Sequence, residues 1–253
     1  MKGIDIHAHL CFPDTYENVD KLVETIKKEM TAVISSSARY DESIRVLELA
    51  KKYPGLIFPT LGYHPVEGDD SEGVMRLIKE NKDLVVAVGE VGLDYHWEQL
   101  TAKREKQKEV FHEFLRLSKQ LKKPVVIHSW DAERDCFETA RAYGIPLIFH
   151  CYSGGVDLAK EILDEGYHIS ISTNICFSKK LKKVAKIVPM EQMLLETDAP
   201  FLDPDRIRKK NVPWNIRLSA DKIAELKGVT KEYVLDQTSK NAVKVFNLKL
   251  RRQ

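Results

Sequence analysis

The chain of 253 residues carries 40 Lys and Arg against 38 Asp and Glu, a formal net charge of +2, so no global field draws it to a polyanion. Its 43% of hydrophobic residues can fill a sizeable core, and no apolar run reaches the roughly 20 residues of a membrane span. No signal-peptide region opens the sequence and the four cysteines form no C-x-x-C pair, which argues against a secreted disulfide scaffold and favours a cytoplasmic protein.

Short apolar runs recur along the chain and are separated by polar or glycine-bearing turns. They are rich in Leu and β-branched residues, as expected for strands that are buried on both faces. The pattern predicts eight strands, at Gly3–His7, Ala32–Ser36, Ile57–Leu61, Leu84–Val88, Val125–His128, Leu147–His150, Tyr167–Ile171 and Met193–Glu196.

Segments between these runs show helical periodicity. Thr101–Lys122 is the longest, and Pro124 stops it just before the next strand. After the eighth run, Ser219 is expected to cap a helix that ends at Gly228, and Thr230 to cap a last helix. The other predicted helices are Asn18–Met30, Asp41–Lys52, Gly154–Glu165 and Ser178–Val188.

Eight strands that alternate with helices over 253 residues predict an α/β fold, a single (β/α)8 TIM-type barrel that forms one domain over residues 1–253. A doubly wound open sheet is the structural alternative. The irregular segment 200–215 follows the last predicted strand and contains three prolines. We interpret it as a functional loop.

Side chains that can bind metals collect at the carboxyl ends of the predicted strands. In a barrel these ends converge on one face, where active sites lie. His7 and His9 are two residues apart on a strand, so their imidazoles point the same way. The candidate ligands are His7, His9, Glu90, His128, His150 and Asp198.

Imidazole and carboxylate together suit Zn²⁺, Mn²⁺ or Fe²⁺, and carboxylate-rich sets tolerate Mg²⁺. Six ligands are too many for one tetrahedral ion, so we predict two divalent ions. We assign His7, His9 and Asp198 to one ion, His128 and His150 to the other, and Glu90 to both. Singly, each residue could be a buried core histidine, a turn cap or an Asx turn; His112 and His168 are interpreted in that structural way.

The stretches IDIHAHL, LGYHP, VGEVGLDYH, KPVVIHSWDA, FHCYSGG and LLETDAPFL, in this order, resemble the TatD family of metal-dependent deoxyribonucleases. The resemblance covers nearly the whole chain. It implies a TIM-type barrel, a divalent-metal centre, and hydrolysis of phosphodiester bonds in single-stranded DNA by a 3′–5′ exonuclease with roles in DNA repair. The family's metal ligands carry over onto the same six positions.

For such a reaction, two metals can activate water and clamp the phosphoryl oxygens. Asp198 is our candidate to orient the attacking water or accept its proton, and His64 to donate to a phosphate oxygen. His64 and His96 are candidate substrate contacts. Four basic residues follow the last predicted strand, and their charges suit a phosphate backbone. These are Arg206, Arg208, Lys209 and Lys210.

Aromatic residues in the loops of the same face could stack on unpaired bases. These are Tyr95, Trp97, Tyr152 and Trp214. Trp97 stands where the family commonly has Arg. The alternative is that the aromatic residues pack the loops and the charges are solvated surface.

Two other functions remain open on the sequence. One is an amidohydrolase-like hydrolase for small-molecule esters, amides or phosphoesters, although the fourth strand offers Glu90 and no Lys. The other is a non-enzymatic binding barrel, which would leave six ligands unused. A dinucleotide oxidoreductase is not supported, because no G-x-G-x-x-G follows the first strand. A barrel closes its own edges, so we expect a monomer.

Overall fold

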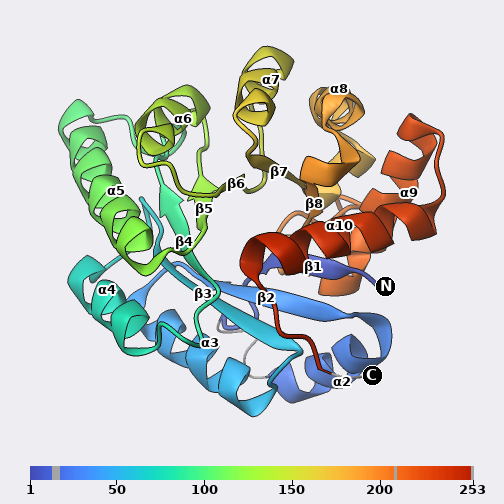
Figure 1. The fold of residues 1–253 in the computed structure, drawn as a ribbon, viewed down its shortest axis with the longest axis horizontal. Helices are drawn as coiled ribbons and strands as arrows, with labels where there is room; N and C mark the ends of the chain where they lie inside the picture. Colours follow the sequence, from blue (N-terminus) through green and yellow to red (C-terminus); the bar gives the residue numbers. More distant parts are fainter. Residues whose placement is uncertain (13–17, 208–209, 252–253) are drawn as a thin grey trace.

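The computed structural model describes residues 1–12, 18–207 and 210–251, coloured along the chain in Figure 1. Eight parallel strands form one sheet in which each strand pairs with the next along the chain. A bridge between Ala8 and Ala199 joins the end of β1 to the segment after β8, so the sheet rolls into a nearly closed barrel. The strands are β1 (Ile4–Ala8), β2 (Ala32–Ser37), β3 (Ile57–Tyr63), β4 (Ala87–Gly92), β5 (Val125–His128), β6 (Leu147–Phe149), β7 (His168–Ile171) and β8 (Met193–Leu195).

A helix follows each strand, and the helices surround the barrel (Figure 1). They are α2 (Val19–Glu29), α3 (Tyr40–Lys52), α4 (Ser71–Glu80), α5 (Thr101–Leu121), α6 (Glu133–Arg141), α7 (Val156–Asp164), α8 (Lys179–Ile187), α9 (Ile216–Lys227) and α10 (Lys231–Phe246), with 3₁₀ turns η1 (Thr173–Cys176), η2 (Met190–Gln192) and η3 (Pro213–Asn215). In the part of the chain that the structure describes, no helix combines the length and apolar character that crossing a membrane requires.

Apolar side chains fill the half of the barrel interior that lies at the amino ends of the strands. Ile4, Ile6 and Ile34 point inward there, and Phe246 and Leu248 pack against them from the end of α10 and just beyond it. We call Ala242, Phe246 and Leu248 the C-terminal plug. Because this core occupies the amino ends of the strands, the polar residues at their carboxyl ends are left to line the opposite mouth.

Strand β4 passes very close to its neighbours. A Cβ atom at Gly92 would lie 1.9 Å from the carbonyl oxygen of His128, and one at Gly62 would lie 2.2 Å from that of Glu90. The pairing register also shifts on both sides of Glu90, between Leu61 and Tyr63 and between Val88 and Val91. The two glycines therefore let β4 bulge at the position of Glu90.

The predicted barrel is confirmed, two local predictions are corrected and a third is confirmed. The fourth strand begins at Ala87 and runs through the glycines to Gly92, whereas residues 84–86 precede it as coil. Helix α9 begins at Ile216, directly after the 3₁₀ turn η3, so Ser219 is a buried residue inside the helix and no cap. Thr230 does cap α10, since its side chain accepts a hydrogen bond from the Tyr233 amide.

For helices α4 and α6 no bounds were predicted. Asp70 caps α4 by accepting a hydrogen bond from the Gly73 amide. Helix α6 has only nine residues, with three buried side chains, Cys136, Phe137 and Ala140. So short an apolar stripe gives little periodicity to recognise.

Candidate metal centre

The end of β1 and the segment after β8 bring three predicted ligands together. His7 Nε2 lies 3.2 Å from His9 Nε2, and Asp198 Oδ1 lies 3.6 Å from the first and 3.3 Å from the second. The amide of Asp198 donates to the carbonyl of His7 at 2.9 Å, which fixes this segment beside β1. These three residues therefore form one compact donor set.

Glu90 lies between this set and the other two predicted ligands. Its Oε1 is 3.4 Å from His9 Nε2, and its Oε2 is 3.0 Å from His150 Nε2 and 3.7 Å from His128 Nδ1. Burial alone would raise the pKa of Glu90, but the neighbouring histidines outweigh burial and hold the pKa well below its usual range. Glu90 is thus an ionised carboxylate in contact with both groups of ligands.

The donor atoms fit divalent cations. One donor atom from each of His7, His9 and Asp198 lies within 4.8 Å of the others, and the same holds for Glu90, His128 and His150. Both ring nitrogens of His150 and Oδ1 of Asp198 are buried without a hydrogen bond among the described residues. Buried polar atoms normally have partners, and nitrogen and carboxylate oxygen atoms gathered in this way suit a bound cation.

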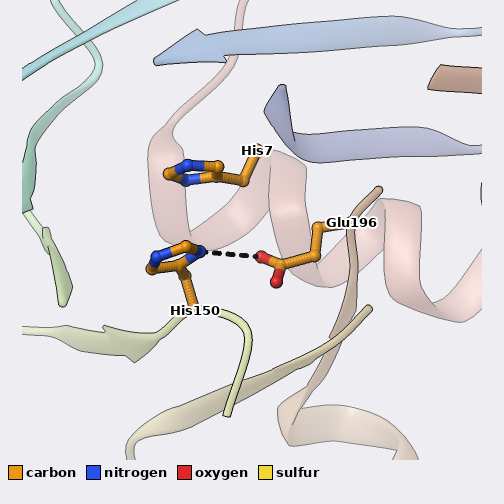
Figure 2. Close-up of side chains that lie close together, drawn as sticks. All are labelled: His7, His150 and Glu196. Atoms are coloured by element: carbon orange, nitrogen blue, oxygen red, sulfur yellow. Dashed lines mark ion pairs between the residues drawn. The ribbon is translucent and has the colours of Figure 1, made fainter. Parts of the chain in front are cut away.

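The two groups also touch through their rings. His7 and His150 stack with centroids 4.0 Å apart and planes 14° from parallel, and Figure 2 shows Glu196 beside them. Glu196 is fully buried; its Oε2 lies 3.6 Å from His150 Nδ1, and its Oε1 accepts the amide of Cys151 at 2.5 Å. Glu196 was not among the predicted ligands, although it lies two residues before Asp198 in the stretch LLETD.

A second carboxylate was also missed. Asp94 Oδ2 lies 2.9 Å from His128 Nε2, and Oδ1 accepts the amide of Trp97 at 2.8 Å. Burial raises the pKa of Asp94, but the hydrogen bonds to His128 and Trp97 outweigh it, so the pKa is lowered and the group is charged. Asp94 and Glu196 thus each place a carboxylate behind a histidine, an arrangement that orients metal-binding imidazoles.

His64 lies at the same mouth, after β3. Its Nδ1 accepts the amides of Val66 and Glu67 at 3.2 and 3.3 Å, so the ring proton belongs on Nε2. Burial lowers its pKa to about 3, which keeps the ring neutral. Its ring meets that of His128 edge to face at 4.3 Å. His64 can therefore donate one hydrogen bond to a bound molecule.

The mouth contains a cavity of about 460 Å³. The candidate ligands that line it include His9, Glu90 and Asp198, and His64 lies beside them. Its other walls carry exposed apolar side chains. These are Val66, Trp97, Trp130 and Phe201. Among the lining residues that the structure describes, Lys180 is the one cation.

The predicted substrate contacts lie in different places. The Arg206 guanidinium sits over the ring of Phe177 at 4.9 Å, and Arg206 does not belong to the cavity lining. Arg208, with Lys209, falls outside the described residues. His96 stacks on Trp130, which does line the cavity.

Of the proposed stacking residues, only Trp97 is largely exposed at the mouth. Tyr152 is buried with its hydroxyl bonded to the carbonyl of Gly155, and Trp214 packs against the main core. The Tyr95 hydroxyl donates to Asp135 at 2.7 Å. These three rings support the loops.

A parallel barrel whose carboxyl-end mouth gathers the six candidate ligands, four imidazoles and two carboxylates, is typical of a metal-dependent hydrolase. The family model described as TatD related DNase matches residues 4–247, and the chain belongs to this family of metal-dependent hydrolases.

An uncharacterized metal-dependent hydrolase of Methanocaldococcus jannaschii is 41% identical to this chain, over 99% of each protein. The human deoxyribonuclease TATDN3 is 33% identical, over 96% of this chain and 94% of its own length. Among solved structures, a TatD homologue of Escherichia coli superposes with a TM-score of 0.90 and 25% identity, covering 98% of this chain and 99% of its own.

Proposed function

We propose that this protein is a deoxyribonuclease that cleaves phosphodiester bonds in single-stranded DNA from the 3′ end, using two divalent ions. The observation that carries the proposal is the position of Glu90, which contacts both donor sets of the mouth. The name of the human relative, a deoxyribonuclease, supports DNA as the substrate.

His7, His9 and Asp198 would hold one ion, His128 and His150 the other, and Glu90 would belong to both. When bound, two ions of Mg²⁺, Mn²⁺ or Zn²⁺ would activate the attacking water and neutralise charge on the phosphoryl oxygens.

Within this proposal, Asp198 orients the attacking water and accepts its proton. Its side chain is 16% exposed, so it reaches both the donor set and the cavity. His64 donates a hydrogen bond from Nε2–H to a non-bridging or leaving oxygen, because its Nδ1 is already an acceptor. His96, Arg206 and Arg208 complete the proposed substrate contacts. We further propose that residues 1–253 act as one domain and as a monomer, in the cytoplasm and in DNA repair.

The test is cleavage of a single-stranded oligonucleotide labelled at its 5′ end, with Mg²⁺, Mn²⁺ or Zn²⁺ and with a chelator as control. The proposal predicts a ladder that shortens one nucleotide at a time, no cleavage with the chelator, and slower cleavage of duplex DNA. If none of the three metals supported cleavage of the oligonucleotide, the proposal would be contradicted.

A small-molecule hydrolase is the second candidate. Besides Lys180, the described lining of the cavity contains the carboxylates of Glu42, Glu67, Glu90, Asp94 and Asp198. Such an acidic lining suits a neutral ester or amide better than a polyanion when the metals are absent. Turnover of small esters or amides, with DNA left intact, would favour this candidate.

A further inference from the structure

Two tryptophans and a histidine form an exposed aromatic corner on the rim of the cavity. Trp97 is 66% exposed and Trp130 is 40% exposed, and their ring centroids lie 6.0 Å apart with planes at 85°. His96 stacks flat on Trp130 at 4.0 Å and 7°. We call His96, Trp97 and Trp130 the aromatic corner. Exposed indoles grouped in this way indicate a binding surface.

The corner is held in place before any ligand arrives. The amide of Tyr95 donates to the carbonyl of Trp130 at 2.9 Å, which joins the loop after β4 to the loop after β5. His96 Nδ1 lies 3.0 Å from Asp131 Oδ2, which fixes the ring on Trp130. A rigid aromatic surface loses little entropy on binding, so it can contribute affinity.

Asp94 connects the corner to the metal centre. One of its oxygens accepts the amide of Trp97, and the other binds Nε2 of His128. Trp97 and Trp130 also line the same cavity as Glu90 and His128. A molecule that places one group at the metal centre therefore has its neighbouring group beside the indoles.

The chemistry of the corner selects a flat, uncharged ring. Its three side chains present ring faces and edges, and the nearest charged partner that holds it, Asp131, is an anion that would repel a phosphate. A planar ring can stack on one indole while its edge meets the other, because the planes are nearly perpendicular. Nucleobases have such faces in single strands, whereas base pairs in a duplex conceal them.

We propose that the aromatic corner binds the unpaired base of a nucleotide next to the phosphate at the metal centre. This inference rests on the proposed function, and it adds the base as a recognised part of the substrate. Stacking accepts every base, so the corner favours single strands without strong sequence preference.

Binding of two non-hydrolysable probes to the metal-loaded protein tests the corner. One probe is a short phosphorothioate oligothymidylate, and the other has the same backbone with abasic sugars. The oligothymidylate should quench tryptophan fluorescence and bind about 10-fold more tightly than the abasic probe. Trp97→Ala and Trp130→Ala should lose this discrimination, and Trp97→Phe should keep part of it.

Trp97→Ala leaves the hydrogen bond to Asp94 intact, since that bond uses the backbone amide. Tyr233→Ala is the matched control, because Tyr233 is an exposed aromatic residue on α10 outside this cavity. It should bind both probes like the wild type. Equal wild-type affinity for the two probes, or equal losses for both in the tryptophan variants, would overturn the inference.

Cleavage of ordinary oligothymidylate separates the two proposals. Base-dependent binding without cleavage would support the role of the aromatic corner and contradict the nuclease function. Cleavage with base-independent binding would support the nuclease function and contradict the role of the corner. If an aryl ester quenches the tryptophans and the oligothymidylate does not, the corner belongs to the small-molecule hydrolase.

Discussion

The histidines of the centre differ in what lies behind them. Nδ1 of His7 is 3.1 Å from the neutral hydroxyl of Ser36, whereas the carboxylates of Asp94 and Glu196 lie behind His128 and His150. A carboxylate behind an imidazole fixes the ring orientation and raises its basicity as a ligand. We therefore expect the metal position of His128 and His150 to bind more tightly.

Replacing Glu196 with Gln tests this expectation. Gln has the same size and can still accept the Cys151 amide, but it lacks the charge beside His150. We expect metal affinity at one position to fall about 10- to 100-fold, as measured by calorimetric titration of the metal-free protein. Glu191→Gln, an exposed position on the same segment, is the control. Affinity equal to the wild type would contradict the role of Glu196.

Asp198→Asn should reduce the rate of DNA cleavage by about 100-fold or more, because the amide cannot accept the proton of water. The midpoint of thermal unfolding should change little, since Asp198 is partly exposed and its backbone contact to His7 remains. Steady-state kinetics and thermal denaturation measure the two effects. Near-normal turnover would remove Asp198 from the mechanism.

At the scale of residues, the sequence allowed the six candidate ligands to be predicted because each follows an apolar run. The structure brings all six to one mouth. Glu196 also ends an apolar run, whereas Asp94 lies beyond the fourth one, and neither was predicted as part of the centre. Their roles depend on which histidine each of them faces: His128 at the end of the next strand for Asp94, and His150 two strands away for Glu196. A linear pattern does not contain that information.

At the scale of elements, the bulge of β4 requires two glycines. Gly92→Ala would place a methyl group 1.9 Å from the His128 carbonyl, so β4 and β5 must separate. We expect a loss of about 1–3 kcal/mol in the free energy of unfolding, with weaker metal binding at His128. Urea denaturation and metal titration measure both quantities.

Gly155→Ala is the matched control for this substitution, because a Cβ at Gly155 meets nothing within 4 Å. Gly155 is the N-cap of α7 with φ −83°, a conformation that Ala can adopt, so Gly155→Ala should cost only the poorer N-cap preference of Ala, about 1 kcal/mol or less. If Gly92→Ala were as stable as Gly155→Ala, the close approach of the strands would not constrain β4.

Elements with strong periodicity were predicted well, and the boundaries less so. The long helix α5 ends at Leu121, one residue before the predicted end. The fourth strand was placed too early because Val85 and Val86 continue the apolar run, yet the ladder begins at Ala87. Glycines within a bulged strand look like a turn in the sequence, and only pairing with β3 and β5 shows that they belong to the strand.

At the scale of the whole molecule, the barrel interior is apolar at the amino ends of the strands and polar at the mouth formed by their carboxyl ends. Phe246 is 2% exposed and packs in the apolar part. Phe246→Ala should cost about 3–5 kcal/mol in the free energy of unfolding by leaving a cavity. The folded variant should bind metal like the wild type, since the plug does not touch the ligands. Urea denaturation and metal titration test both statements, with Tyr233→Ala as the exposed control.

The barrel itself could be predicted because its evidence is distributed over the chain. Eight apolar runs alternate with helical segments, and no single error in a boundary changes their number. The closure between β1 and the segment after β8 follows from the fold class. The plug could not be foreseen, because the periodicity of residues 231–246 does not say which end of the barrel the helix covers.

The position of the C-terminal plug has a consequence for folding during synthesis on the ribosome. Ala242, Phe246 and Leu248 come after all eight strands in chain order, so the ribosome synthesises them after the strands. Until then the isoleucines at the amino ends of the first two strands have no cover on that side. Folding is therefore completed only after synthesis of the final helix, and a nascent chain halted before residue 242 should attract chaperones that bind apolar surface.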